Sequence, residues 1–258
     1  MSQYVLVHGA WLGGWCWGRV AARLRAAGHD VFAPSLTGLG DRSHLLNAEV
    51  NLSTHIDDIC NIIAWENLED VVLCGHSYGG FVITGVADKL MNRISALHYL
   101  DALIPEDGQS MYDTIPLEYR DMFDAGAEEG DGFSVPPISA EDFGVNNGDR
   151  EWVDSKQSNQ SIASFQQPIA LTGAHLQITD QQFIWASNFE HPSTRDNYER
   201  LRNDPAWNVI SLACGHHIMI DMPDELADIL MNSNKGSSDP KTFGMVNSSV
   251  NCRLCSIV

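Results

Sequence analysis

The sequence predicts an α/β fold, in which a mostly parallel, twisted sheet is flanked by helices and carries an inserted cap. Two observations lead to this prediction. Short apolar runs alternate with helical segments along most of the chain, and the run GHSYG at residues 75–79 joins one apolar run directly to a helix. Strands that alternate with helices form parallel sheets with right-handed crossovers. The 258 residues, 44% of them hydrophobic, suffice for one such core.

The first half of the sheet is predicted from unbroken apolar runs, which are typical of strands buried on both faces. The run YVLV at residues 4–7 is the first strand, and helical periodicity over residues 17–27 stops at Gly28, a common helix end. The expected elements that follow are a strand over 30–33, a helix over 52–65 that Ser53 or Thr54 caps, a strand over 71–74, a helix over 78–91 and a strand over 94–100.

The regular alternation stops near residue 104 and resumes after residue 168. The intervening stretch mixes acidic residues, Gly, Ser and Asn with scattered large apolar residues. We expect it to cover the carboxyl edge of the sheet, where open α/β sheets bind ligands. The chain then continues with a strand over 182–186, a helix over 195–203, a strand over 209–212 and a helix over 224–231. The predicted domains are a core of residues 1–103 and 169–232, a cap of residues 104–168 and a flexible tail of residues 233–258.

Acidic residues outnumber Lys and Arg by 34 to 15, which gives a formal net charge of −19. Such a chain repels phosphate backbones and anionic lipids, so neither nucleic acid nor a membrane is an expected partner. A cationic small molecule is favoured, although the same charge also serves solubility alone. The sequence begins without a signal-peptide pattern, lacks a membrane-spanning apolar run and shows no disulfide framework among its six cysteines. A cytoplasmic location is therefore expected.

Ser77 is the candidate nucleophile. It stands at the centre of a Gly-x-Ser-x-Gly run that follows a strand and precedes a helix. A sharp strand-to-helix turn exposes the serine hydroxyl, and Gly75 and Gly79 leave room for that bend. The alternative is a structural turn with an inert serine. The strand–turn–helix context favours the nucleophile.

An acyl-transfer site also needs N–H donors for the oxyanion. One is expected from Tyr78, the residue after the nucleophile. The other is expected from the loop HGAW at residues 8–11, which follows the first strand. Within that loop the Ala10 N–H is preferred, with Trp11 as the second choice.

The base of such a site is a histidine after the last core strand. His216 and His217 both follow the strand over 209–212, and spacing alone does not choose between them. The acid that orients the base commonly follows the next-to-last strand. No carboxylate directly follows the strand over 182–186, so Glu190 and Asp180 stay open as alternatives. We prefer Asp101, which ends the strand after the nucleophile helix.

Several segments resemble the plant methylesterase and hydroxynitrile lyase branch of the α/β-hydrolases. They are VLVHGAW at residues 5–11, GWCW at 14–17, GHSYGG at 75–80, and Gly215-His216 with Met219 and Pro223. The resemblance covers residues 3 to about 231, and its spacing favours His216 over His217 as the base. The related haloalkane dehalogenases place their acid after the strand that ends here at Asp101. The segments PEDG at 105–108 and DPAW at 204–207 resemble a bacterial subgroup that includes macrolide esterases from mobile resistance elements.

The resemblance implies a serine carboxylic-ester hydrolase that acts through an acyl-enzyme and needs no metal or cofactor. The leading expected substrate is the lactone of a macrolide antibiotic, whose protonated amino sugars an acidic cap would attract. One alternative is a general small-ester carboxylesterase or methylesterase. A hydroxynitrile-lyase-like enzyme is another, but that branch usually needs a lysine near the site, and no lysine precedes Lys89. A non-enzymatic ligand receptor is the third. The sequence leaves the oligomeric state open.

Overall fold

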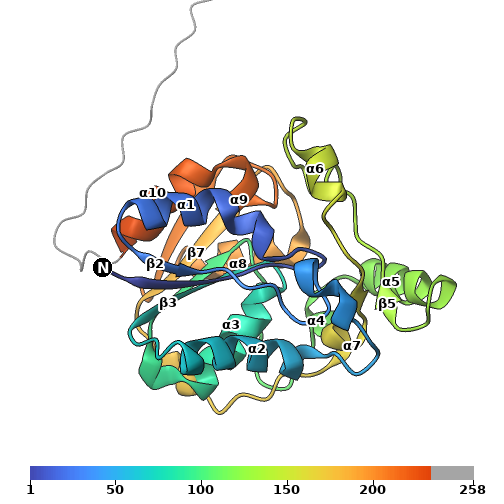
Figure 1. Ribbon diagram of the computed structural model, residues 1–258, viewed down its shortest axis with the longest axis horizontal. Coiled ribbons are helices and arrows are strands. Elements are labelled where there is room, and N and C mark those ends of the chain that lie inside the picture. Colours follow the sequence, from blue (N-terminus) through green and yellow to red (C-terminus); the bar gives the residue numbers. More distant parts are fainter. Residues whose placement is uncertain (234–258) are drawn as a thin grey trace, which may run out of the picture.

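Six parallel strands form one sheet at the centre of the molecule (Figure 1) in the computed structural model, which describes residues 1–233. The strand order is β2-β1-β3-β4-β7-β8, and each neighbouring pair is parallel. The strands are β1 Gln3–Val7, β2 Asp30–Phe32, β3 Val71–His76, β4 Ile94–Leu100, β7 Gln181–Ala186 and β8 Trp207–Leu212. The predicted α/β architecture with a parallel sheet is thereby confirmed.

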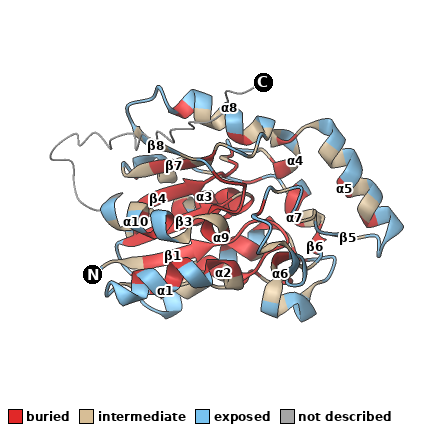
Figure 2. Cartoon of the chain, turned by 90° about the horizontal axis from the view of Figure 1, so that it is seen from above, coloured by how far each residue is buried: buried red, intermediate tan, exposed pale blue. Residues whose placement is uncertain are grey.

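Helices cover both faces of the sheet because alternate strand residues point to opposite faces. Tyr4 and Leu6 pack into a cluster with the helices Gly18–Ala26, Ile218–Asp221 and Pro223–Ser233, whereas Val5 and Val7 pack into a second cluster with the helices Leu52–Trp65 and Gly79–Lys89. The inner strands β1, β3, β4 and β7 lie in the buried centre between these layers (Figure 2), whereas the edge strands β2 and β8 are largely half-buried or exposed. The core helices are α1 Gly18–Ala26, α2 Leu52–Trp65, α3 Gly79–Lys89, α8 Pro192–Leu201, α9 Ile218–Asp221 and α10 Pro223–Ser233, and the 3-10 helices are η1 Gly14–Trp17, η2 Gly40–Leu45, η3 Met91–Arg93 and η4 Ala174–Gln177.

Two predicted helix starts are corrected by the structure. Asn51, rather than Ser53 or Thr54, caps α2, because the Asn51 side chain accepts a hydrogen bond from the Thr54 N–H at 3.1 Å. The Thr54 hydroxyl in turn accepts the Asn51 N–H, which completes a capping box. Helix α8 begins at Pro192 instead of Arg195, since the fixed φ of proline suits the first helical position.

The segment between β4 and β7 projects beyond the carboxyl edge of the sheet (Figure 1). Its elements are α4 Met111–Thr114, α5 Leu117–Glu129, β5 Ser134–Val135, α6 Arg150–Asp154, β6 Gln160–Ser161 and α7 Ala163–Gln166. Strands β5 and β6 pair antiparallel in a small separate sheet. Ser233, the first residue of the predicted tail, ends α10, and the rest of that tail lies outside the described residues. Within residues 1–233, none of the helices has both the length and the apolarity required to cross a bilayer.

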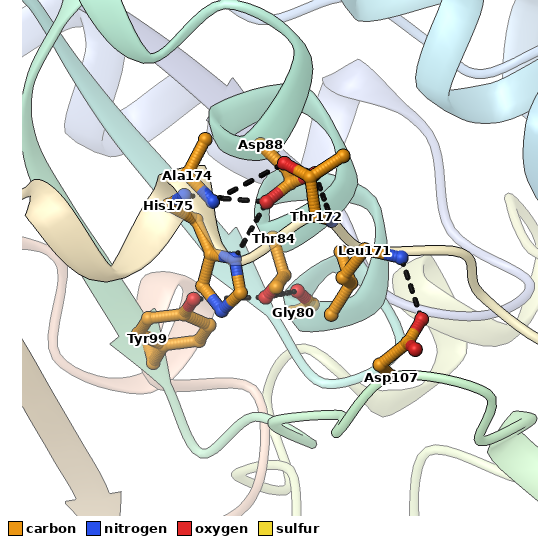
Figure 3. A network of polar contacts seen from close by, with 9 residues as sticks. All are labelled: Gly80, Thr84, Asp88, Tyr99, Asp107, Leu171, Thr172, Ala174 and His175. Atoms are coloured by element: carbon orange, nitrogen blue, oxygen red, sulfur yellow. Dashed lines mark hydrogen bonds and ion pairs between the residues drawn. The ribbon is translucent and has the colours of Figure 1, made fainter.

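Asp88, near the end of α3, ties the loop before β7 to the core (Figure 3). Its carboxylate accepts the Thr172 N–H and hydroxyl at 2.7 and 2.9 Å, and the His175 N–H and Nδ1 at 3.3 and 2.9 Å. Its side chain is only 5% exposed. Burial alone would raise the pKa of Asp88, but the hydrogen bonds from His175 and Thr172 hold that pKa well below its usual range. The folded state therefore favours the ionised carboxylate.

Asp88→Asn is expected to lower the free energy of unfolding by about 2 kcal/mol at pH 7, because an amide turns one acceptor into a donor that faces other donors. A folded pKa below the unfolded value of about 4 gives stability that is complete above that value and is lost as pH falls. Urea unfolding at several pH values measures both effects, and the variant should show a flatter acid limb. Asp57→Asn is the control, since its exposed ion pair with Lys89 contributes at most about 1 kcal/mol. Equal losses in both variants would contradict the assignment.

Candidate active site

The Ser77 turn is a strained connection between β3 and α3. Ser77 has φ +54°, a conformation that few non-glycine residues adopt. Its N–H donates to the Leu100 carbonyl at 3.1 Å, and its carbonyl accepts the N–H groups of Gly80 and Leu103 at 3.0 and 3.2 Å. A Cβ on Gly79 would lie 2.8 Å from the His8 carbonyl oxygen, so only glycine fits there. The surrounding backbone thus fixes the serine in its strained position.

Ser77 lines a cavity of about 470 Å³ at the carboxyl edge of the sheet. The wall is mostly apolar and comes largely from the segment between β4 and β7. Its apolar members are Ala10, Trp11, Leu103, Met111, Ile115, Met122, Phe123, Ile138, Phe143 and Phe189, and its polar members besides Ser77 are Tyr119, Asp142, His191, Thr194 and His216. Such a volume and lining are typical of small-molecule sites. A larger cavity of about 870 Å³, which His175 lines, includes neither Ser77 nor His216.

His216 and Asp101 form a buried pair at the wall of this cavity. The Nδ1 atom of His216 lies 2.6 Å from Oδ2 of Asp101, and the two residues are 4% and 0% exposed. The Phe143 ring stacks on the imidazole with ring centroids 5.1 Å apart, and the Phe143 carbonyl accepts the His216 N–H at 2.9 Å. The Asp101 carboxylate also accepts the Ala186 N–H at 3.5 Å. Both side chains are therefore held in one orientation.

Burial sets the resting charge of this pair. It lowers the pKa of His216, because a protonated imidazole is poorly solvated there. It also raises the pKa of Asp101, while the Ala186 N–H and the Thr194 side chain act in the opposite direction. The resting imidazole is therefore neutral. If Nδ1 carries the proton shared with Asp101, Nε2 is left free to accept another.

The other candidates for base and acid lie elsewhere. The ring of His217 is buried against His76 and Phe143 and does not line the cavity. Glu190 is exposed on the loop after β7. Asp180 directly precedes β7, at the opposite end of that strand from Ala186. Among these candidates, only His216 and Asp101 are brought together beside the Ser77 cavity.

The three candidate oxyanion donors differ in whether their N–H already makes a hydrogen bond. Ala10 lines the cavity, and Tyr78 directly follows Ser77 at the start of α3. Trp11 also lines the cavity, with φ +60°, but its N–H already donates to Oε1 of Gln160 at 2.9 Å. The Trp11 N–H is thus engaged, whereas Ala10 and Tyr78 stay candidates.

His191 and Gln160 are two residues at this site that the sequence did not single out, and Asp142 is one of the cap acids expected to attract a cationic substrate. His191 lines the cavity, packs against Tyr119 with ring centroids 5.0 Å apart, and has its pKa lowered to about 4 by burial. Its place after β7, where other enzymes of this fold carry the acid, was the available signal. Asp142 and Gln160 belong to the irregular segment, which offers no periodicity to read. Residues 1–233 contain no cluster of three or more side chains suited to hold a metal.

Comparison with known proteins gives a consistent family. A sequence model of the alpha/beta hydrolase family matches residues 4–229. A carbendazim hydrolyzing esterase of Nocardioides sp. (strain SG-4G) is 41% identical over 238 residues, which cover 89% of this chain and 98% of that protein. Methylesterase 8 of Arabidopsis thaliana is 33% identical over 110 residues, or 42% of this chain and 40% of that protein.

Solved structures share the fold. An extracellular alpha/beta-hydrolase from a Paenibacillus species superposes with a TM-score of 0.80 at 22% identity, and the match covers 91% of this chain and all of that one. A pyrethroid hydrolase from Sphingobium faniae JZ-2 gives a TM-score of 0.68 at 23% identity over 91% of this chain and 98% of that one. At such identities these two likenesses establish the fold alone.

Proposed function

Since this chain belongs to the alpha/beta hydrolase family and has esterase relatives, we propose that Ser77, His216 and Asp101 are its catalytic triad. The observation that carries the proposal is the 2.6 Å contact between His216 and Asp101, beside the cavity that Ser77 lines. Serine ester hydrolysis requires a nucleophile, a base that takes its proton and an acid that orients the base.

The chemistry follows from these positions. The Ser77 hydroxyl attacks the ester carbonyl carbon while its proton passes to Nε2 of His216, and the negative oxygen is held by the N–H groups of Ala10 and Tyr78. His216 then gives that proton to the departing alcohol, which leaves an acyl group on Ser77. Water attacks the acyl group, His216 takes its proton and returns it to Ser77, and the acid departs. No step uses a metal or an organic cofactor.

For the substrate we propose first a macrolide-like lactone with a cationic substituent. Asp142, which is exposed, is the one carboxylate among the lining residues of the described chain, and it would face a protonated amino sugar. Asp131, Asp149 and Asp154 support this proposal less, because none of them lines the cavity. A cavity of about 470 Å³ would take the reacting part of such a ring.

Carbendazim, the compound in the relative's name, is the second candidate substrate. Two observations favour it: the 41% identity extends over 98% of that relative, and the apolar wall suits a compact aromatic molecule. The lyase alternative receives less support, because no lysine lines the Ser77 cavity of the described chain. The receptor alternative receives less support, because ligand binding alone does not require the buried His216–Asp101 pair.

Mass spectrometry of a panel that holds macrolides, carbendazim and small neutral esters tests the proposal. We expect the gain of one water in at least one macrolide. Asp142→Asn should raise KM for the cationic macrolide by about two- to fivefold, as expected for an exposed charge pair, and leave neutral esters unchanged. The amide can still accept the Ser139 hydroxyl that now binds Asp142 at 2.7 Å, so the local fold is kept.

Glu141→Gln is the matched control, because Glu141 pairs with Arg150 and does not line the cavity. Rising salt should weaken macrolide turnover in the intact protein and less so in Asp142→Asn. Hydrolysis of neutral esters or carbendazim without any macrolide turnover would contradict the proposed lactone substrate and support the esterase function.

A further inference from the structure

Trp11, at the oxyanion loop, is bound through all of its polar groups by the segment between β4 and β7. Its N–H donates to Oε1 of Gln160 at 2.9 Å, and its indole Nε1–H donates to the Val135 carbonyl at 3.1 Å. Its own carbonyl accepts the N–H of Ser158 at 3.0 Å. Val135 and Gln160 are directly opposite each other in the β5–β6 pair. The Val135–Gln160 cross-strand pair therefore accepts hydrogen bonds from both N–H groups of Trp11.

Gln160 is well placed to fix this loop. Its side chain is fully buried, and its Nε2 donates to the Ser164 hydroxyl at 2.9 Å. That hydroxyl donates to the Ser161 carbonyl at 2.7 Å, so the amide cannot rotate without losing both of its bonds. Its Oε1 atom is therefore held toward Trp11.

The conformation of Trp11 restrains the peptide that joins it to Ala10. Trp11 has φ +60°, a strained conformation for a residue other than glycine, which persists only where neighbours hold it. The hydrogen bond from Trp11 to Gln160 is such a restraint. The Ala10 N–H, a proposed oxyanion donor, belongs to the next peptide unit, Gly9–Ala10. A rotation of the Ala10–Trp11 peptide would pass through Ala10 and misdirect that N–H.

We propose that Gln160 is a positioning residue, which acts through Trp11 to aim the Ala10 N–H at the oxyanion. This proposal rests on the proposed esterase function. It makes the inserted segment part of the catalytic apparatus as well as the wall of the cavity. The effect belongs to the transition state, since a developing oxyanion needs the donor more than a neutral carbonyl does.

Gln160→Met tests the proposal, because methionine keeps the length of the side chain and removes the acceptor. We expect kcat for a neutral ester to fall about 10- to 100-fold, below or at the loss measured when a whole oxyanion donor is removed, with KM little changed. Binding of a trifluoromethyl ketone, which mimics the tetrahedral oxyanion, should weaken by the same factor. A purely structural role would lower thermal stability without that matched change.

Gln157→Met is the control, since Gln157 lies three residues away and its side chain makes no hydrogen bond to Trp11 within residues 1–233. If Gln160→Met does not fold, Ser164→Ala is the second variant, because it keeps Gln160 and removes the hydroxyl that accepts the hydrogen bond from its Nε2. It should lower kcat in the same direction, about three- to tenfold. Normal kcat and normal ketone binding in a folded Gln160→Met or Ser164→Ala protein would overturn the proposal. Absence of ester hydrolysis in the intact protein would instead overturn the esterase function.

Discussion

Ser77→Ala is expected to lower kcat/KM for ester hydrolysis by a factor of about 10⁴ to 10⁶, the largest effect of any single substitution in this chain. The proposed acyl-enzyme is formed by the Ser77 oxygen, and alanine offers no atom in its place. The fold should persist, because the turn is held by backbone hydrogen bonds to Leu100, Gly80 and Leu103 that alanine also makes. Steady-state kinetics on a neutral aryl ester measure the loss.

A serine-reactive phosphonate gives a second readout of the same prediction. The intact protein should be labelled at one site, and labelling should vanish in Ser77→Ala. Ser187→Ala is the matched control, since the Ser187 hydroxyl donates to the Leu212 carbonyl and does not line the cavity. Persistent labelling of Ser77→Ala would show that another residue is the nucleophile. No labelling and no turnover in the intact protein would favour a ligand receptor.

The parts of the site that local sequence encodes were the ones that could be predicted. Unbroken apolar runs fix the strands, and GHSYG fixes the turn that strains Ser77. Asp101 follows from the same logic, because the carboxyl ends of parallel strands meet at one edge. The adjacent His216 and His217 differ only in the side of the chain that each faces. Spacing within one sequence does not distinguish them, and the preference for His216 came from the resemblance to the family.

The contribution of the inserted segment could not be predicted, and the reason is physical. Its short helices and two-residue strands carry no hydrophobic period, so no pattern says which side chains face the cavity. Gln160 reaches Trp11 across 149 positions of sequence, through a hydrogen bond that exists only after the fold has formed. Asp142 and His191 gain their place at the cavity in the same way.

Asp101→Asn carries the second largest expected effect, a fall in kcat of about 10³- to 10⁴-fold. The Ala186 N–H donates to Oδ1 of Asp101, so an asparagine would keep its oxygen there and turn its NH₂ group toward His216. Nδ1 of His216 would then have to accept a hydrogen bond, which moves the ring proton to Nε2. An imidazole in that tautomer cannot take the proton of Ser77. Single-turnover kinetics should show the loss in the acylation step.

Glu190→Gln is the control that separates the two candidate acids, because Glu190 is exposed on the loop after β7 and follows the strand where related enzymes carry theirs. It should keep nearly full activity. Residual turnover of Asp101→Asn should rise with pH, since hydroxide replaces the missing base. The Ser77 label should form more slowly in this variant but at the same site. If instead Glu190→Gln were inactive and Asp101→Asn retained its rate, the 2.6 Å contact of Asp101 with His216 would have only a structural role, and the orienting acid would have to reach His216 from the loop after β7.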